Sequence, residues 1–205
     1  MGLEGDRNAG AILDGLRSEG LAVRDHFLDS AEVEALAGCA RTRRERGEFA
    51  AARIGGGRLL EPETRGDSIC WLADPEFDAE RHVLRSLEEL RLELNGGTLL
   101  GLFDLELHYA WYPAGAGYGR HVDQPRSRGH RRISLILYLN QDWRASDGGA
   151  LRCFFASGTY RDIDPIGGRL VAFLTEGREH AVMTTRRPRL SLTGWYRERE
   201  AALLR

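Results

Sequence analysis

The sequence predicts a single α+β domain, residues 1–205, in which N-terminal helices brace one face of a sheet that closes into a barrel or sandwich. The chain has 205 residues, a length that one hydrophobic core accommodates. Hydrophobic periodicity is helical in the first part and changes to short strand-like segments from residue 99 onward. Helices followed by strands are typical of α+β folds. We therefore expect helical support over about residues 1–96 and the strand-built core over about 97–198.

Three segments in the first half of the chain show helical periodicity. Apolar side chains recur in each at the spacing of a helix that buries one face. Asp29 or Ser30 can cap the second helix, and the run Asn95-Gly96-Gly97 ends the third. The expected helices are residues 8–19, 30–46 and 77–94.

Short segments rich in Leu, Ile, Val, Tyr and Trp follow, separated by clusters of Gly, Pro, Asp and Asn. Several short strands with such turns between them are typical of a barrel or a sandwich. The glycine-rich polar stretch 47–72 is predicted to be a long hairpin or a mobile loop. The expected strands lie near residues 102–112, 132–140, 150–156, 168–174, 179–184 and 189–197.

Composition argues against several classes of function. The formal net charge is -2, which gives no footprint for binding nucleic acid. There is no apolar run of about 18 residues, so no membrane span is expected, and the N-terminus lacks the apolar core of a signal peptide. The three cysteines lie far apart, which fits a reducing cytoplasm. All 29 basic residues are arginine, which we attribute to a G+C-rich bacterial genome. We expect a cytoplasmic monomer.

The triplet His121-Val122-Asp123 places a histidine and a carboxylate two positions apart. In a strand these two side chains share a face, so both can reach one metal ion. His180 lies in a later strand-like run and adds a second imidazole. Two histidines and one carboxylate form the facial triad of non-haem Fe(II) oxygenases, which leaves positions open for substrate and dioxygen. Because surface or hydrogen-bonded histidines also give this pattern, the hypothesis depends on the neighbouring residues.

A second polar group lies on the strand that follows His180. A polar face buried inside a barrel is costly unless a polar ligand binds there, and an arginine fork suits a carboxylate. An exposed edge strand is the alternative. Tyr138 can donate to the same carboxylate if its face points inward; otherwise it is a core tyrosine with another partner. Strand parity puts four of these side chains on one face: Arg189, Ser191, Thr193 and Trp195.

The motifs with a specific order and spacing are Arg65-Gly66-Asp67-Ser68-Ile69-Cys70-Trp71, the run from Tyr112 to Asp123, the run from Tyr138 to Trp143, the run from Gly148 to Arg152, and His180 followed by Arg189 and Trp195-Tyr196. Taken together, these motifs resemble the hypoxia-inducible-factor prolyl hydroxylases and their bacterial prolyl 4-hydroxylase relatives. The likeness spans about residues 20–198.

The resemblance implies a double-stranded β-helix, or jelly roll, braced by the N-terminal helices. It implies Fe(II), 2-oxoglutarate and O2 as reactants, with ascorbate keeping the iron reduced. The expected reaction is hydroxylation at C4 of a prolyl residue in a protein, with release of succinate and CO2. Elongation factor Tu is the first candidate substrate, and the animal members raise the question of oxygen sensing. The carboxylate of Asp123 favours hydroxylation over halogenation, because radical halogenases of similar architecture carry a small residue at this position.

The resemblance also implies roles for individual residues. The expected iron ligands are His121, Asp123 and His180. The residues expected to contact 2-oxoglutarate are Arg189 and Tyr138 at its distal carboxylate, with Tyr112, Thr193 and Trp195 lining the same pocket. The residues expected at the substrate-covering loop are Arg65, which lies on it, and Asp67, which would pair with Arg131 to steady it.

Two departures bear on the substrate. His108 stands where the animal enzymes carry an apolar residue, and it is either a hydrogen-bond donor behind the site or a packed or solvent-bonded histidine. Residues 126–130 are more basic than their animal counterparts. An oxygenase acting on a free amino acid or another small molecule is therefore the alternative reading, and a jelly-roll module that binds metal without turnover is a third.

Overall fold

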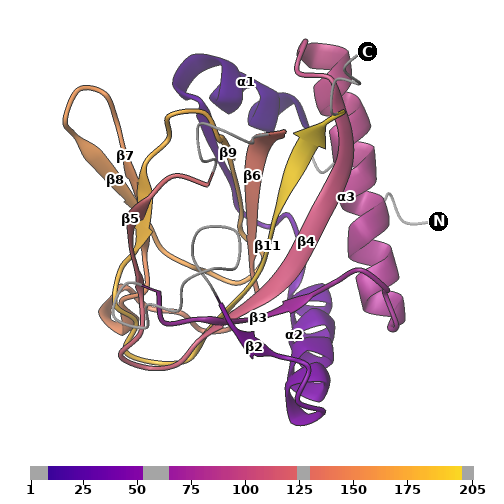
Figure 1. Cartoon of the computed structure of the whole chain (residues 1–205), viewed down its shortest axis with the longest axis vertical. Coiled ribbons are helices and arrows are strands. Elements are labelled where there is room, and N and C mark those ends of the chain that lie inside the picture. The colour runs from indigo at the N-terminus through magenta and orange to yellow at the C-terminus, as the bar shows by residue number, and fades with distance from the viewer. Residues whose placement is uncertain (1–8, 53–64, 124–129, 200–205) are drawn as a thin grey trace, which may run out of the picture.

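The computed structural model describes residues 9–52, 65–123 and 130–199 (Figure 1). Its α-helices are α1 (Ala9–Glu19), α2 (Ser30–Glu45) and α3 (Asp78–Gly97), which confirm the three predicted segments. Asp29 caps α2: its side chain accepts a hydrogen bond from the Glu32 amide, and the Glu32 side chain accepts one from the Asp29 amide. α3 continues through the predicted stop, because the Asn95 side chain bonds to the backbone of Leu102 and ties the end of the helix to the next strand.

The described strands form two antiparallel sheets. The larger sheet has seven strands in the order β1-β9-β6-β11-β4-β3-β2, and the smaller has four in the order β5-β10-β7-β8. In Figure 1 the smaller sheet faces one side of the larger sheet, and α3 lies on the other side. The strands are β1 (Leu21–Arg24), β2 (Ala50–Ala51), β3 (Ser68–Trp71), β4 (Leu102–Tyr112), β5 (Tyr118–His121), β6 (Arg131–Tyr138), β7 (Leu151–Phe154), β8 (Tyr160–Ile163), β9 (Leu170–Leu174), β10 (His180–Val182) and β11 (Arg189–Glu198).

Strand alternation divides the interior into two parts. One face of the larger sheet packs on the helices: Leu135 of β6 and Leu192 of β11 share a core with Leu36 of α2 and Leu87 of α3. The opposite face of the same strands points toward the smaller sheet, and there Tyr138 packs in a separate core with residues of β7 and β9. The helices thus brace one face of the sheet, as predicted, and the other face turns its side chains toward the smaller sheet.

A buried ion pair fastens the helical layer to the sheet. Arg43 of α2 donates from Nε to Glu80 Oε1 of α3 at 2.8 Å, and Glu80 has no exposed surface. Tyr109 of β4 donates its hydroxyl to the same carboxylate at 3.1 Å, and the Glu76 amide donates to its other oxygen. One carboxylate therefore joins two helices and the central sheet.

The structure differs from the sequence prediction at its short strands. We expected the sheet to begin near residue 97, but β1, β2 and β3 already belong to the larger sheet. The hairpin predicted over 47–72 is present in part, because β2 pairs with β3, while residues 53–64 lie outside the described part of the chain. β5 and β8 were not predicted. None of the described helices is long and apolar enough to cross a membrane.

Candidate active site

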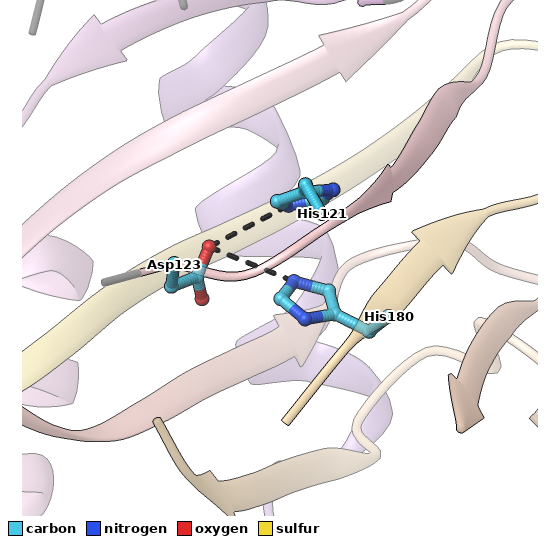
Figure 2. A group of neighbouring side chains, drawn as sticks. All are labelled: His121, Asp123 and His180. Atoms are coloured by element: carbon cyan, nitrogen blue, oxygen red, sulfur yellow. Dashed lines mark ion pairs between the residues drawn. The ribbon is translucent and has the colours of Figure 1, made fainter. Parts of the chain in front are cut away.

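The three predicted metal ligands meet where β5 and β10 pair. His121 ends β5 and lies opposite His180, the first residue of β10. Asp123 follows His121 by two positions, and its Oδ1 lies 3.6 Å from Nε2 of each imidazole (Figure 2). The potential ligand atoms of the three residues all lie within 4.8 Å of one another. Strand pairing therefore brings His180, distant in sequence, to the same point as His121 and Asp123.

Backbone carbonyls orient both imidazoles. Nδ1 of His121 lies 2.8 Å from the Gly119 carbonyl oxygen, and Nδ1 of His180 lies 3.2 Å from that of Arg178. Because a carbonyl can only accept, each Nδ1 carries a hydrogen, and Nε2 is the ring nitrogen that faces Asp123. A second partner that fixes the tautomer in this way is typical of metal-binding histidines.

The carboxylate of Asp123 is ionised, and one of its two oxygens accepts hydrogen bonds from neighbouring side chains. Burial acts to raise its pKa, but the neighbouring imidazoles of His180 and His121 outweigh burial and hold the pKa well below its usual range. Its second oxygen, Oδ2, accepts hydrogen bonds from Ser134 Oγ at 2.7 Å and from Trp195 Nε1 at 2.9 Å. An anionic oxygen, Oδ1, therefore faces the two imidazoles.

Arg189 of β11 and Tyr138 of β6 form a second buried polar group. Arg189 is 1% exposed and donates from Nε to the Gly149 carbonyl at 3.0 Å. Among the described residues, neither its Nη2 nor the Tyr138 hydroxyl has a hydrogen-bond partner, although both atoms are buried. Burial raises the pKa of Tyr138 to about 12, with Arg189 opposing the shift, so the phenol stays protonated and can donate. These two unpartnered donors fit a bound carboxylate.

Tyr112, Ser191 and Thr193 extend this polar face. The Arg189 guanidinium carbon lies 5.0 Å from the centroids of the Tyr112 and Tyr138 rings. Ser191 pairs in register with Tyr138, and its hydroxyl lies 3.1 Å from that of Thr193. The exposed-edge alternative is excluded, because β11 lies between β4 and β6 in the middle of the sheet.

The predicted pair between Asp67 and Arg131 is wrong. Asp67 instead accepts from Arg65 Nε at 2.8 Å, because residues two apart in an extended segment lie on the same side. Arg131 donates from Nε to Glu106 Oε1 at 2.6 Å. Glu106 lies opposite Trp195 in the sheet register, and the Arg131 guanidinium stacks on that indole at 3.5 Å from the centroid, so Glu106 is the nearer carboxylate.

Sequence reasoning missed the roles of Ser134 and Glu106, although parity already put Ser134 on the face of Tyr138. For His108, the packed alternative is confirmed. The imidazole lies 4.9 Å from the Trp71 ring and 5.4 Å from the Trp195 ring, and burial lowers its pKa to about 3, so it is neutral.

Two imidazoles and a carboxylate at one point, beside a buried arginine and phenol with free donors, define the site of a non-haem Fe(II) oxygenase with a carboxylate cosubstrate. Comparison with known proteins agrees. Residues 107–197 match the 2OG-Fe(II) oxygenase superfamily. The crystal structure of a Pseudomonas putida prolyl-4-hydroxylase has 41% identity and a TM-score of 0.86, over 94% of this chain and 100% of that one.

Two animal prolyl hydroxylases are also similar to this chain. The Trichoplax adhaerens prolyl hydroxylase, solved with a hypoxia inducible factor oxygen degradation domain peptide fragment, has 26% identity and a TM-score of 0.83, over 94% of this chain and 90% of that one. Mouse prolyl hydroxylase EGLN3 is 36% identical over 163 residues, which cover 75% of this chain and 66% of the mouse protein. The matched part of this chain thus spans about two thirds of the length of the mouse protein. The chain belongs to the 2OG-Fe(II) oxygenase superfamily and is a homologue of the prolyl hydroxylases.

Proposed function

We propose that this protein is an Fe(II)- and 2-oxoglutarate-dependent dioxygenase that hydroxylates C4 of a prolyl residue in a protein and produces succinate and CO2. The observation that carries the proposal is the pair of buried, unpartnered donors on Arg189 and Tyr138 beside the triad. A metal site alone could serve many reactions. Two buried donors that suit a carboxylate, next to a triad that suits iron, fit 2-oxoglutarate chemistry, and the prolyl hydroxylase relatives support proline as the substrate.

The proposed iron ligands are Nε2 of His121, Oδ1 of Asp123 and Nε2 of His180. When bound, iron and 2-oxoglutarate supply the oxidising power that breaks a C–H bond. This chain holds the ligands in one orientation, with His180 buried and His121 and Asp123 partly exposed. Arg189 and Tyr138 would bind the distal carboxylate of 2-oxoglutarate, with Tyr112, Thr193 and Trp195 around the cosubstrate.

The proposed substrate is a prolyl residue within a polypeptide. The Trichoplax adhaerens relative was solved with a peptide in complex, which supports a protein substrate for this chain as well. Arg65 lies near the metal site, because its guanidinium packs on Tyr118 and the Tyr118 ring stacks on His121 with 3.6 Å between centroids. It can therefore contact a substrate that reaches the iron. Elongation factor Tu is the first candidate, and we propose a single-domain cytoplasmic monomer that uses ascorbate as reductant and binds no nucleic acid.

The deciding experiment gives the purified protein Fe(II), 2-oxoglutarate and ascorbate together with elongation factor Tu, proline-containing peptides or free proline. Mass spectrometry of each candidate would show the gain of one oxygen on proline, and succinate release would report turnover. Asp123→Ala serves as the inactive control. Turnover with free proline and none with any polypeptide would refute the protein substrate and favour the small-molecule alternative.

A further inference from the structure

The two oxygens of the Asp123 carboxylate have different surroundings. Oδ1 lies 3.6 Å from Nε2 of both His121 and His180, on the side where the metal belongs. Oδ2 accepts two hydrogen bonds, from Ser134 Oγ at 2.7 Å and from Trp195 Nε1 at 2.9 Å. The two donors therefore hold Oδ2 away from the metal position.

We propose that Ser134 and Trp195 are positioning residues that restrict Asp123 to one-oxygen coordination of the metal. The inference rests on the proposed iron site. A carboxylate can bind a metal through one oxygen or through both, and the second mode would occupy one of the positions that the facial triad leaves open for cosubstrate and dioxygen. Rotation of Asp123 into the two-oxygen mode would break both hydrogen bonds. Hydrogen bonds to a charged group contribute more to stability than neutral ones.

Sheet register places the two donors side by side. Ser134 of β6 pairs directly with Trp195 of β11, and both side chains are more than nine-tenths buried. Asp123, in contrast, follows β5 of the smaller sheet. The two hydrogen bonds therefore join the metal-binding edge of the smaller sheet to the middle of the larger one, and the register of β6 and β11 sets the direction from which Oδ2 is held.

The indole of Trp195 packs against two further side chains. The guanidinium of Arg131 lies over one part of the ring system at 3.5 Å from the centroid, and the His108 imidazole stacks at 5.4 Å with an interplanar angle of 30°. Glu106 holds Arg131 in place and also accepts from Arg197 at 3.2 Å. The Trp195 N–H is thus a rigid donor, and His108 and Arg131 act on the metal site through the indole.

The experiment titrates metal-free full-length protein with Mn(II) alone, and then titrates Mn(II)-saturated protein with 2-oxoglutarate. Ser134→Ala and Trp195→Phe are each expected to weaken Mn(II) binding by roughly 10- to 100-fold, the effect typical of groups that orient metal ligands. Ser134→Ala is also expected to weaken 2-oxoglutarate binding at saturating Mn(II), because the freed Oδ2 then competes for a coordination position. Ser134→Thr retains the hydroxyl and should restore both affinities.

Matched controls exist elsewhere in the fold. Ser86 on α3 is a buried serine that donates to the His82 carbonyl, and Trp143 is a buried tryptophan that donates to the Gly148 carbonyl. Ser86→Ala and Trp143→Phe should leave Mn(II) affinity unchanged.

Unchanged Mn(II) affinity in both site variants would overturn the proposal. Unchanged 2-oxoglutarate affinity in metal-saturated Ser134→Ala would overturn the one-oxygen restriction. If Ser134→Ala does not fold, as judged by circular dichroism, Trp195→Phe still tests the metal affinity. The Mn(II) titration contains no peptide, so its result stands apart from whether proline is the substrate.

Discussion

Replacing Tyr138 by phenylalanine removes one buried hydroxyl and leaves the ring in place. In the ligand-free protein that hydroxyl has no hydrogen-bond partner among the described residues, and Tyr138 has no exposed surface. A buried polar group without a partner costs about 1–3 kcal/mol. Tyr138→Phe is therefore expected to keep or increase the stability of the ligand-free protein, by up to about that amount. For a chain of this size, 1 kcal/mol raises the Tm by roughly 2–4 °C.

The same substitution is expected to weaken binding of 2-oxoglutarate. A hydrogen bond to a charged partner contributes about 1.5–3 kcal/mol, which corresponds to a loss of affinity of roughly ten- to a hundredfold. A ligand that binds only the folded state stabilises it in proportion to the logarithm of its concentration over Kd. Added 2-oxoglutarate with Mn(II) should therefore raise the Tm of the wild type more than that of the variant.

Tyr196→Phe is the matched control. The Tyr196 hydroxyl is buried and donates to the Leu87 carbonyl of α3, on the helical side of the sheet. Its removal should cost about 1 kcal/mol and leave the affinity for 2-oxoglutarate unchanged. Thermal unfolding and calorimetric titration measure both quantities. If Tyr138→Phe lowered the Tm and left 2-oxoglutarate affinity unchanged, the hydroxyl would be a structural group and the cosubstrate assignment would fail.

Three further predictions concern the metal, the cosubstrate and the helical layer. His121→Ala should abolish Mn(II) binding with the fold retained, and normal metal content would refute the ligand assignment. Arg189→Ala should raise the 2-oxoglutarate requirement strongly and leave Mn(II) affinity intact, as separate titrations would show. Glu80→Gln should cost about 3 kcal/mol in urea unfolding, the low end for a broken buried ion pair, because Arg43 still has Glu48 at 2.7 Å. Burial acts to raise the Glu80 pKa, but Arg43 and backbone amides outweigh it and hold the pKa below its usual range. This stabilisation is therefore present above about pH 4.3 and is lost as the pH falls further. The free energy of unfolding of Glu80→Gln should not show this decrease at low pH.

The larger elements of the fold could be predicted because their periodicity spans several turns or many strand positions. Three of the short strands could not. β1, β5 and β8 have four residues each, and their sequences LAVR, YGRH and YRDI contain charged residues. Sheet pairing, which joins segments distant in sequence, decides their conformation. β5 is polar in part because it carries the proposed metal ligand His121. It therefore lacks the alternating apolar residues by which a strand is predicted.

The sequence indicated which residues gather in the candidate site, but it did not indicate all of the hydrogen bonds and ion pairs between them. Parity identified the inward face of Arg189 and Trp195, because alternation is a local property of a strand. The partners of Arg131 and Trp195 depend instead on which residues β4, β6 and β11 bring together across the sheet. The register puts Glu106 and Ser134 on either side of Trp195, and a single sequence does not contain that register.

The alternation of β11 also separates stability from function along one strand. Leu190, Leu192 and Tyr196 face the helices and belong to the main core, whereas Arg189 and Trp195 face the smaller sheet. Substitutions on the helical face should therefore lower the free energy of unfolding through lost packing, and substitutions on the inner face should change metal or cosubstrate affinity. Tyr138→Phe on the neighbouring strand β6 and Tyr196→Phe on β11 compare the two faces of the larger sheet with the same chemical change. Opposite effects on Tm and on ligand affinity would show that the polar inner face is maintained for its ligand and at a cost to the ligand-free fold.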